Sequence, residues 1–190
     1  MYIVYGGAFN PPTTSHIEIV ELLLNKYKNA KVVILPVGND YNKKELIDFK
    51  FRFEMLNLCF KNNKRVIISR LEDEIDYQGT LNSLNHLSLK YKNIYLATGA
   101  DNVINFTKWI KYEELLSKYP LIIIKRNGID VKVEMEKYQY LNIKYDIINY
   151  NTNVKSTLIR KDLEKYKNWL NEDIYQYILK NKLYGADNNV

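Results

Sequence analysis

MYIVYGGAFNPPTTSH at residues 1–16 joins an apolar stretch to a glycine pair, two prolines and a polar segment. Residues 2–5, YIVY, favour a buried strand because β-branched and aromatic side chains predominate there. The glycine pair allows backbone angles that other residues avoid, so a ligand can approach the main chain closely. The prolines fix their own φ and push the residue before each of them away from helical angles, so a helix cannot begin before about Thr13. The stretch therefore predicts a strand that turns directly into a helix.

The first turn of that helix carries Thr13 to His16. Ser15 and Glu18 have the spacing of a capping box, which we expect to fix the helix start. Unpaired N–H groups and the positive end of the helix dipole attract phosphate. We therefore expect this junction to hold a nucleotide polyphosphate, with His16 beside the bound anion.

Strand-like and helix-like segments alternate along the rest of the chain. The predicted strands cover residues 2–5, 31–36, 65–69, 93–98, 121–125 and 144–148, and predicted helices cover residues 51–60, 80–91 and 112–118, besides the first helix and two more near the C-terminus. This alternation is typical of an α/β fold with a doubly wound, Rossmann-like parallel sheet and helices on both faces. We expect a single domain over residues 1–190, with residues 185–190 frayed. Ligands bind at the carboxyl ends of the strands in such sheets, so the loops after residues 5, 98 and 148 should converge.

Composition narrows the class of protein. The 190 residues and the 46% hydrophobic content fit one soluble globular domain. The formal net charge of +6 suits phosphate-bearing partners without identifying them. The single cysteine, Cys59, has no disulfide partner, which favours a reducing, cytoplasmic setting. The sequence shows no signal-like or bilayer-spanning apolar run, so we expect no membrane association.

A second motif lies at residues 153–160, NVKSTLIR, between a predicted strand and a predicted helix. Ser156 is the expected N-cap, and Arg160 lies four residues later on the same helix face. A hydroxyl, backbone N–H groups and a guanidinium fork in one place predict a second phosphate site. Taken alone, the motif is better explained as a capped helix with an exposed arginine, and the presence of the first motif reverses that preference in favour of the phosphate site.

Together, GGAFNPPTTSH and KSTLIR resemble the paired signatures GGxFxPxxxxH and SSTxIR of the nucleotidyltransferase superfamily. Further landmarks are similar, in their order along the chain, to those of bacterial nicotinate mononucleotide adenylyltransferases. These landmarks are residues 77–80 (YQGT), 98–101 (TGAD), 108–109 (KW), 125–128 (KRNG) and 181–184 (NKLY). The resemblance covers nearly the whole chain.

The resemblance implies an adenylyl transfer of NAD biosynthesis, in which the phosphate of nicotinate mononucleotide attacks the α-phosphorus of ATP. It also implies Mg²⁺, bound mainly through the ATP phosphates, and we assign it no protein ligand. The resemblance assigns catalytic roles to His16, Arg160 and Lys43. The residues implied at ATP are Gly7, Ala8, Phe9, Thr13, His16, Gly99, Asp101, Ser156, Thr157 and Arg160. Those implied at the mononucleotide are Thr80, Trp109, Lys43 and Arg52.

Departures from the family pattern leave alternatives open. Ser15 replaces a usual glycine, and Lys155 replaces the first serine of SSTxIR. Asn10 replaces an aspartate of the family pattern. The resulting Asn-Pro pair resembles that of related enzymes which accept nicotinamide as well. The alternatives are nicotinamide mononucleotide or phosphopantetheine as the acceptor, or a nucleotide-binding regulator with little turnover. We expect small-molecule partners, ATP and a mononucleotide, and no nucleic acid because no motif for it is present. The sequence leaves open whether the chain forms a homo-oligomer.

Overall fold

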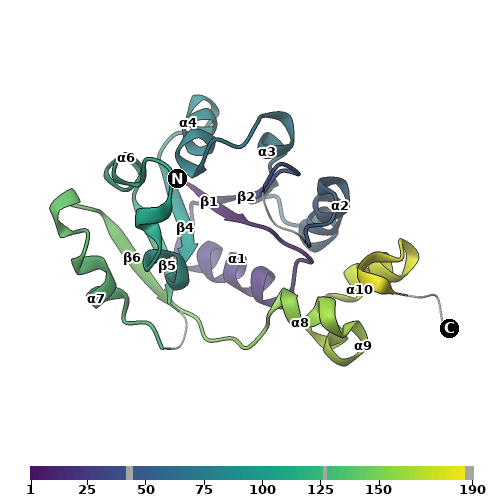
Figure 1. Ribbon diagram of the computed structural model, residues 1–190. Coiled ribbons are helices and arrows are strands. Elements are labelled where there is room, and N and C mark those ends of the chain that lie inside the picture. Colours follow the sequence, from purple (N-terminus) through teal and green to yellow (C-terminus); the bar gives the residue numbers. More distant parts are fainter. Residues whose placement is uncertain (42–44, 126–127, 187–190) are drawn as a thin grey trace.

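The fold is a six-stranded, all-parallel sheet with helices on both faces (Figure 1). The computed structural model describes residues 1–41, 45–125 and 128–186. The strands are β1 (Tyr2–Gly7), β2 (Lys31–Pro36), β3 (Val66–Ile68), β4 (Ile94–Gly99), β5 (Leu121–Lys125) and β6 (Tyr145–Asn149). Their order across the sheet is β3-β2-β1-β4-β5-β6. The predicted α/β, Rossmann-like fold is confirmed.

Ten α-helices connect and cover these strands within the described residues. They are α1 (Thr14–Lys26), α2 (Phe49–Phe60), α3 (Leu71–Glu74), α4 (Thr80–Lys90), α5 (Ala100–Val103), α6 (Tyr112–Lys118), α7 (Val131–Glu136), α8 (Ser156–Lys161), α9 (Leu163–Tyr166) and α10 (Glu172–Lys180). Short 3₁₀ turns lie at Phe106–Lys108, Gln139–Leu141, Lys167–Trp169 and Leu183–Gly185. No helix in the described ranges combines the length and apolar character needed to cross a bilayer.

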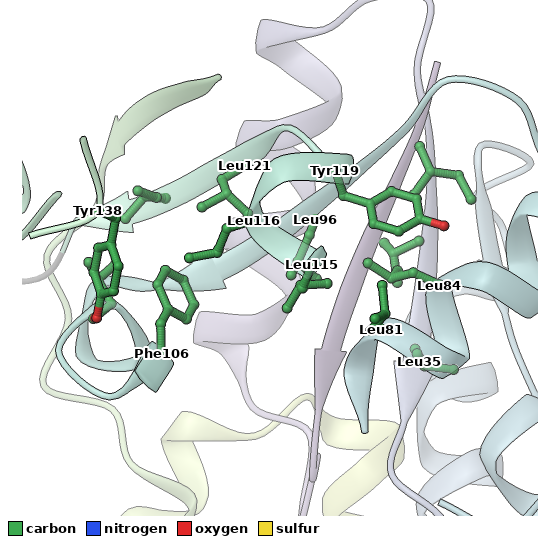
Figure 2. Packing of buried hydrophobic residues seen from close by; sticks show 14 of the residues in the cluster. Leu35, Leu81, Leu84, Leu96, Phe106, Leu115, Leu116, Tyr119, Leu121 and Tyr138 are labelled. Atoms are coloured by element: carbon green, nitrogen blue, oxygen red, sulfur yellow. The ribbon is translucent and has the colours of Figure 1, made fainter. Parts of the chain in front are cut away.

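The strands bury both of their faces because successive side chains point to opposite sides. Val4 and Leu96 face one layer, which α4, α5, α6 and α7 cover. Figure 2 shows this layer, in which Leu81 and Leu84 of α4 lie near Leu115 of α6. The opposite faces of β1, β2 and β5 pack against α1 and α2. A third apolar cluster joins α8 and α10 to α2.

The strand predictions hold closely, and β2 and β5 have the predicted bounds. Several details of the helices are wrong. Helix α2 begins at Phe49, two residues early, because Asp48 caps it by accepting from the Lys50 N–H at 2.9 Å. The predicted helix after Ser156 is interrupted at Asp162, which caps α9 by accepting from the Lys165 N–H.

The last described residues of the chain follow α10. Gly185 belongs to a 3₁₀ turn, and Ala186 packs into the third cluster together with α10. The fraying of residues 185–190 stays a prediction. Residues 187–190 lie outside the described residues.

Candidate active site

A cavity of about 530 Å³ opens at the carboxyl ends of β1 and β4. These two strands are neighbours where the strand order reverses, which is the usual ligand position in doubly wound sheets. Several predicted site residues border it, namely Gly7, Ala8, Thr80, Asp101 and Trp109. Tyr77 and Lys108, which lie in the landmark motifs but had no assigned role, also line the cavity. Sequence reasoning missed other lining residues, among them Val37, Tyr41, Glu72, Asn102 and Ile110.

Aromatic rings provide flat walls in this cavity. Trp109 is half-buried and packs edge-to-face on the buried Phe106, with ring centroids 5.2 Å apart. Tyr41 and Tyr77 form a second edge-to-face pair, also at 5.2 Å. Flat apolar faces suit the stacking of a planar aromatic ring. The predicted position of Trp109 at a heteroaromatic substrate therefore agrees with its surroundings.

The start of α4 reaches the cavity because of a glycine. Gly79 is the N-cap of α4 and has a φ of +93°, which favours glycine. A Cβ on Gly79 would lie 2.9 Å from the Cβ of Ile110. The absence of a side chain thus lets the first residue of α4, Thr80, approach the Trp109–Ile110 segment.

Gly99 and Asp101 are coupled at the end of β4. A Cβ on Gly99 would lie 2.3 Å from Oδ1 of Asp101, so the carboxylate occupies the space that the glycine leaves. Asp101 borders the cavity, whereas Gly99 leaves room for the Asp101 carboxylate. Asn102 donates to the hydroxyl of Thr98 at 2.9 Å and secures the same turn.

Glu72 places a buried carboxyl in the cavity wall. It is 5% exposed, and its Oε1 accepts from the Ser83 hydroxyl at 2.7 Å. Its Oε2 is buried without a hydrogen-bond partner among the described residues. Burial raises the pKa of Glu72, with the Ser83 hydrogen bond opposing that shift. No local motif marks this residue, because its burial results from tertiary packing.

His16 is oriented by the residue that caps its helix. The Thr13 N–H donates to His16 Nδ1 at 2.9 Å, and the Thr13 hydroxyl lies 2.8 Å from the same nitrogen. Because Nδ1 accepts a hydrogen bond from the Thr13 N–H, the proton of a neutral His16 imidazole lies on Nε2. The expected capping box of Ser15 and Glu18 is wrong. Thr13 is the N-cap and pairs with His16, while Glu18 accepts from the Tyr150 hydroxyl.

Helix α8 docks its first turn against the loop that leads into α1 (Figure 1). The Ser156 hydroxyl donates to the Pro11 carbonyl at 2.9 Å, and Arg160 Nη1 donates to the Asn10 carbonyl at 2.8 Å. The two predicted phosphate motifs therefore meet, although they are about 145 positions apart in the sequence. The prediction that Ser156 is the N-cap is wrong. Lys155 takes that position, and the Ser156 hydroxyl is engaged by the Pro11 carbonyl instead.

Asn10 is the centre of a hydrogen-bond network. It is 2% exposed, its Nδ2 donates to the Glu45 carbonyl at 2.7 Å, and its Oδ1 accepts from the Tyr184 hydroxyl at 2.8 Å. An ionised aspartate has no donor for the Glu45 carbonyl. The asparagine is thus explained by structure, independently of the choice between acid and amide substrates.

Some predicted site residues stand apart from the cavity or outside the described residues. Arg52 is 0% exposed and donates to backbone carbonyls instead of bordering the cavity, and the Phe49 ring packs on its guanidinium. Phe9 is also buried, at 2% exposure. Thr157 is exposed on α8. Lys43 lies outside the described residues.

The described part of the chain contains no group of three or more His, Cys, Asp or Glu side chains that could hold a metal ion. Ser15, which replaces a glycine of the family pattern, is 4% exposed and faces the Tyr150 hydroxyl. Its side chain is therefore kept away from the ligand side of the loop.

Known proteins resemble the chain along nearly its whole length. The profile of the family described as cytidylyltransferase-like matches residues 4–162. The "Probable nicotinate-nucleotide adenylyltransferase" of Acholeplasma laidlawii (strain PG-8A) is 37% identical over 185 residues, with 97% of each chain covered. The protein of the same name from Carboxydothermus hydrogenoformans is 31% identical over 195 residues, covering 95% of this chain and 96% of the relative. The structure of Plasmodium falciparum nicotinic acid mononucleotide adenylyltransferase complexed with NaAD has a TM-score of 0.76 at 25% identity, with 98% of each chain covered.

Proposed function

The chain belongs to the cytidylyltransferase-like family and, within it, to the nicotinate-nucleotide adenylyltransferases, and we propose that it transfers the adenylyl group of ATP to nicotinate mononucleotide. The products are nicotinate adenine dinucleotide and pyrophosphate. One observation carries the assignment of the site: α8 docks through Ser156 and Arg160 on the loop that leads into α1, and that same loop borders the cavity that contains Trp109.

The reaction needs no nucleophile from the protein. A phosphate oxygen of the mononucleotide forms a bond to the α-phosphorus of ATP, and the bond from that phosphorus to the bridging oxygen of pyrophosphate breaks. The protein has to align the two substrates and stabilise charge on the phosphate oxygens. His16 supplies an Nε2–H donor to the α-phosphate. Arg160, Ser156 and Thr157 hold the β- and γ-phosphates as pyrophosphate leaves.

Mg²⁺ enters with ATP as part of the substrate. The described residues of the site form no carboxylate cluster, which suits an ion that keeps phosphate and water ligands, as Mg²⁺ commonly does. The bound ion would reduce the negative charge of the triphosphate. Asp101, at the end of β4, is the cavity carboxylate that we assign to the ATP ribose.

The start of α4 favours the acid over the amide. Thr80 is the first residue of an 11-residue helix and borders the cavity, so the positive end of the helix dipole faces the substrate. A ring stacked on Trp109 would direct its substituent to this end. The positive end of the dipole stabilises the carboxylate of nicotinate more than the neutral amide of nicotinamide. Glu72 opposes this preference only when ionised, and burial raises the pKa of Glu72.

Paired assays test the proposal. The chain is incubated with ATP and either nicotinate or nicotinamide mononucleotide, and pyrophosphate and dinucleotide are measured. We expect turnover with both products and a higher kcat/KM for the acid. Tight binding of ATP without dinucleotide would favour a nucleotide-binding regulator, and turnover with phosphopantetheine would favour another acceptor. The cytoplasmic setting and the oligomeric state stay predictions.

A further inference from the structure

Arg52 is a buried cation in the first turn of α2 that joins two loops of the candidate active site. Its Nε donates to the Ile47 carbonyl at 2.9 Å, and its Nη1 donates to the Ala8 carbonyl at 3.1 Å. Its guanidinium lies 5.5 Å from the ring centroid of Phe49. Ala8 belongs to the loop between β1 and α1, and Ile47 to the segment that leads into α2. One side chain therefore links the two segments.

This arrangement is costly for stability. The Nη2 of Arg52 is buried without a hydrogen-bond partner, and no carboxylate within residues 1–41, 45–125 and 128–186 forms an ion pair with it. Burial lowers the pKa of Arg52 to about 10, against smaller raising effects of Tyr184 and nearby carboxylates. Apolar side chains of similar volume are often at least as stabilising at buried charged positions. Packing alone does not explain an arginine here.

The carbonyl that Arg52 holds comes directly before a strained residue. Phe9 has a φ of +47°, in the left-handed region that residues with a Cβ seldom adopt. Its ring is fixed against Tyr5 and His16, with centroids 5.6 and 5.1 Å away. A peptide group is planar, so a carbonyl directed to Arg52 turns the Phe9 N–H in the opposite direction.

The two N–H groups of this turn have no hydrogen-bond acceptor within the described residues. Neither the Ala8 N–H nor the Phe9 N–H donates to an acceptor in the described part of the chain. Ala8 borders the cavity, next to the loop on which α8 docks. Successive unpaired N–H groups in a turn are donors for an anion.

We propose that Arg52 is a positioning residue for adenylyl transfer, which holds the Ala8–Phe9 peptide so that the N–H groups of this turn meet a phosphate oxygen of ATP. The proposal rests on the proposed reaction at this site. Through Ile47, the same guanidinium keeps the start of α2 in place relative to that turn. Without the Arg52 guanidinium, the Ala8–Phe9 peptide group is free to rotate. A displacement of its N–H donor by about 1 Å can lower the rate about 100-fold.

Arg65 offers a matched control for substitutions of Arg52. It also donates to backbone carbonyls, those of Ala30, Leu24 and Tyr27, but it does so at the amino ends of the strands, away from the cavity. Arg65→Met and Arg52→Met therefore remove the same kind of interaction. Thermal unfolding reports how far each lowers Tm.

The experiment compares steady-state kinetics of these variants at equal folded fraction. Arg52→Met should lower kcat/KM for ATP about 100-fold and leave KM for nicotinate mononucleotide within about threefold, because the aromatic wall is intact. Arg52→Lys keeps the charge and one donor and should recover part of the loss. Arg65→Met should keep its turnover per folded molecule within about twofold, the usual range for a substitution remote from the chemistry.

Equal losses in Arg52→Met and Arg65→Met would overturn the proposal. Should Arg52→Met fail to fold, an unchanged kcat/KM for ATP in Arg52→Lys would overturn it as well. An inactive wild-type chain would refute the proposed function, and ATP affinity would then decide the role of Arg52. Arg52→Lys should weaken ATP binding under the proposal, and Arg65→Met should not.

Discussion

The cavity beside Trp109 and the junction of α1 with α8 differ in one respect. The groups that could bind a ligand face open space in the cavity, whereas at the junction they already form hydrogen bonds within the protein. The cavity presents open aromatic faces and an accessible helix start. At the junction, Arg160 and Ser156 are engaged by the Asn10 and Pro11 carbonyls and by Glu45. The pyridine side is therefore preformed, whereas the phosphate side has to exchange internal partners for the triphosphate. This difference predicts which substitutions change the rate and which change the affinity.

The largest effect is expected for His16→Ala. His16 is preorganised by Thr13, and its Nε2–H should interact most strongly as charge develops on the transferring phosphate. Loss of such a donor costs about 100- to 1,000-fold in kcat. Both KM values should change little. His86→Ala is the matched control, since His86 is exposed on α4 and its Nδ1 lies 2.9 Å from the Asn82 carbonyl of the same helix. A loss confined to KM would contradict the proposed role of His16.

Arg160→Ala should have the next largest effect, and chiefly on ATP. A charge-assisted hydrogen bond contributes about 1.5–3 kcal/mol, which is about 10- to 100-fold in KM for ATP. The KM for the mononucleotide should hardly move. Lys161→Ala, at the exposed neighbouring position, controls for a general change of charge on α8. Unchanged ATP affinity in Arg160→Ala would show that the junction does not hold the triphosphate.

Trp109→Ala tests the preformed side of the comparison. Loss of a stacked ring costs about 0.5–1.5 kcal/mol beyond area burial, so KM for the mononucleotide should rise about tenfold while KM for ATP stays constant. Trp169→Ala is the control, because Trp169 packs on Tyr166 in the third apolar cluster. It should lower Tm without raising the KM for the mononucleotide. A rise in both KM values of Trp109→Ala would indicate that the two regions are not independent.

The preformed side was the more predictable of the two regions. The strands follow from β-branched and aromatic runs, and the loops that line the cavity follow from where parallel strands end. The position of Trp109 needed the family resemblance, because a half-buried tryptophan has no distinctive local pattern. Glu72 escaped prediction, since its place in the wall results from contact with Ser83, eleven residues away.

At the junction, tertiary contacts override local preferences. Ser156 has the propensity of an N-cap, but the Pro11 carbonyl takes its hydroxyl. Arg52 lies near a polar segment in the sequence, yet the Ala8 carbonyl, 44 residues away, holds it inside the protein. Tyr184 closes the network on Asn10 from the far end of the chain. Partners so distant in sequence leave no periodic signal, so only the existence of the junction could be predicted.

The smallest effect, and one of opposite sign, is expected for Glu45→Gln. The Glu45 carboxylate lies 2.5 Å from Arg160 Nη2, and its side chain is 72% exposed, against 10% for Arg160. A triphosphate that binds Arg160 has to displace this carboxylate. The amide keeps the size of the side chain and leaves the Glu45 backbone carbonyl on Asn10 unchanged.

Exposed ion pairs contribute about 0.2–1 kcal/mol, so the KM for ATP in Glu45→Gln should fall about two- to fivefold. Titration with ATP, followed by initial rates, measures the change. Glu164→Gln is the matched control, because Glu164 is similarly exposed, at 65%, and pairs with Lys167 at 3.1 Å. A raised KM for ATP in Glu45→Gln would mean that the carboxylate positions Arg160 for the nucleotide instead of competing with it. The phosphate side would then be as preformed as the pyridine side.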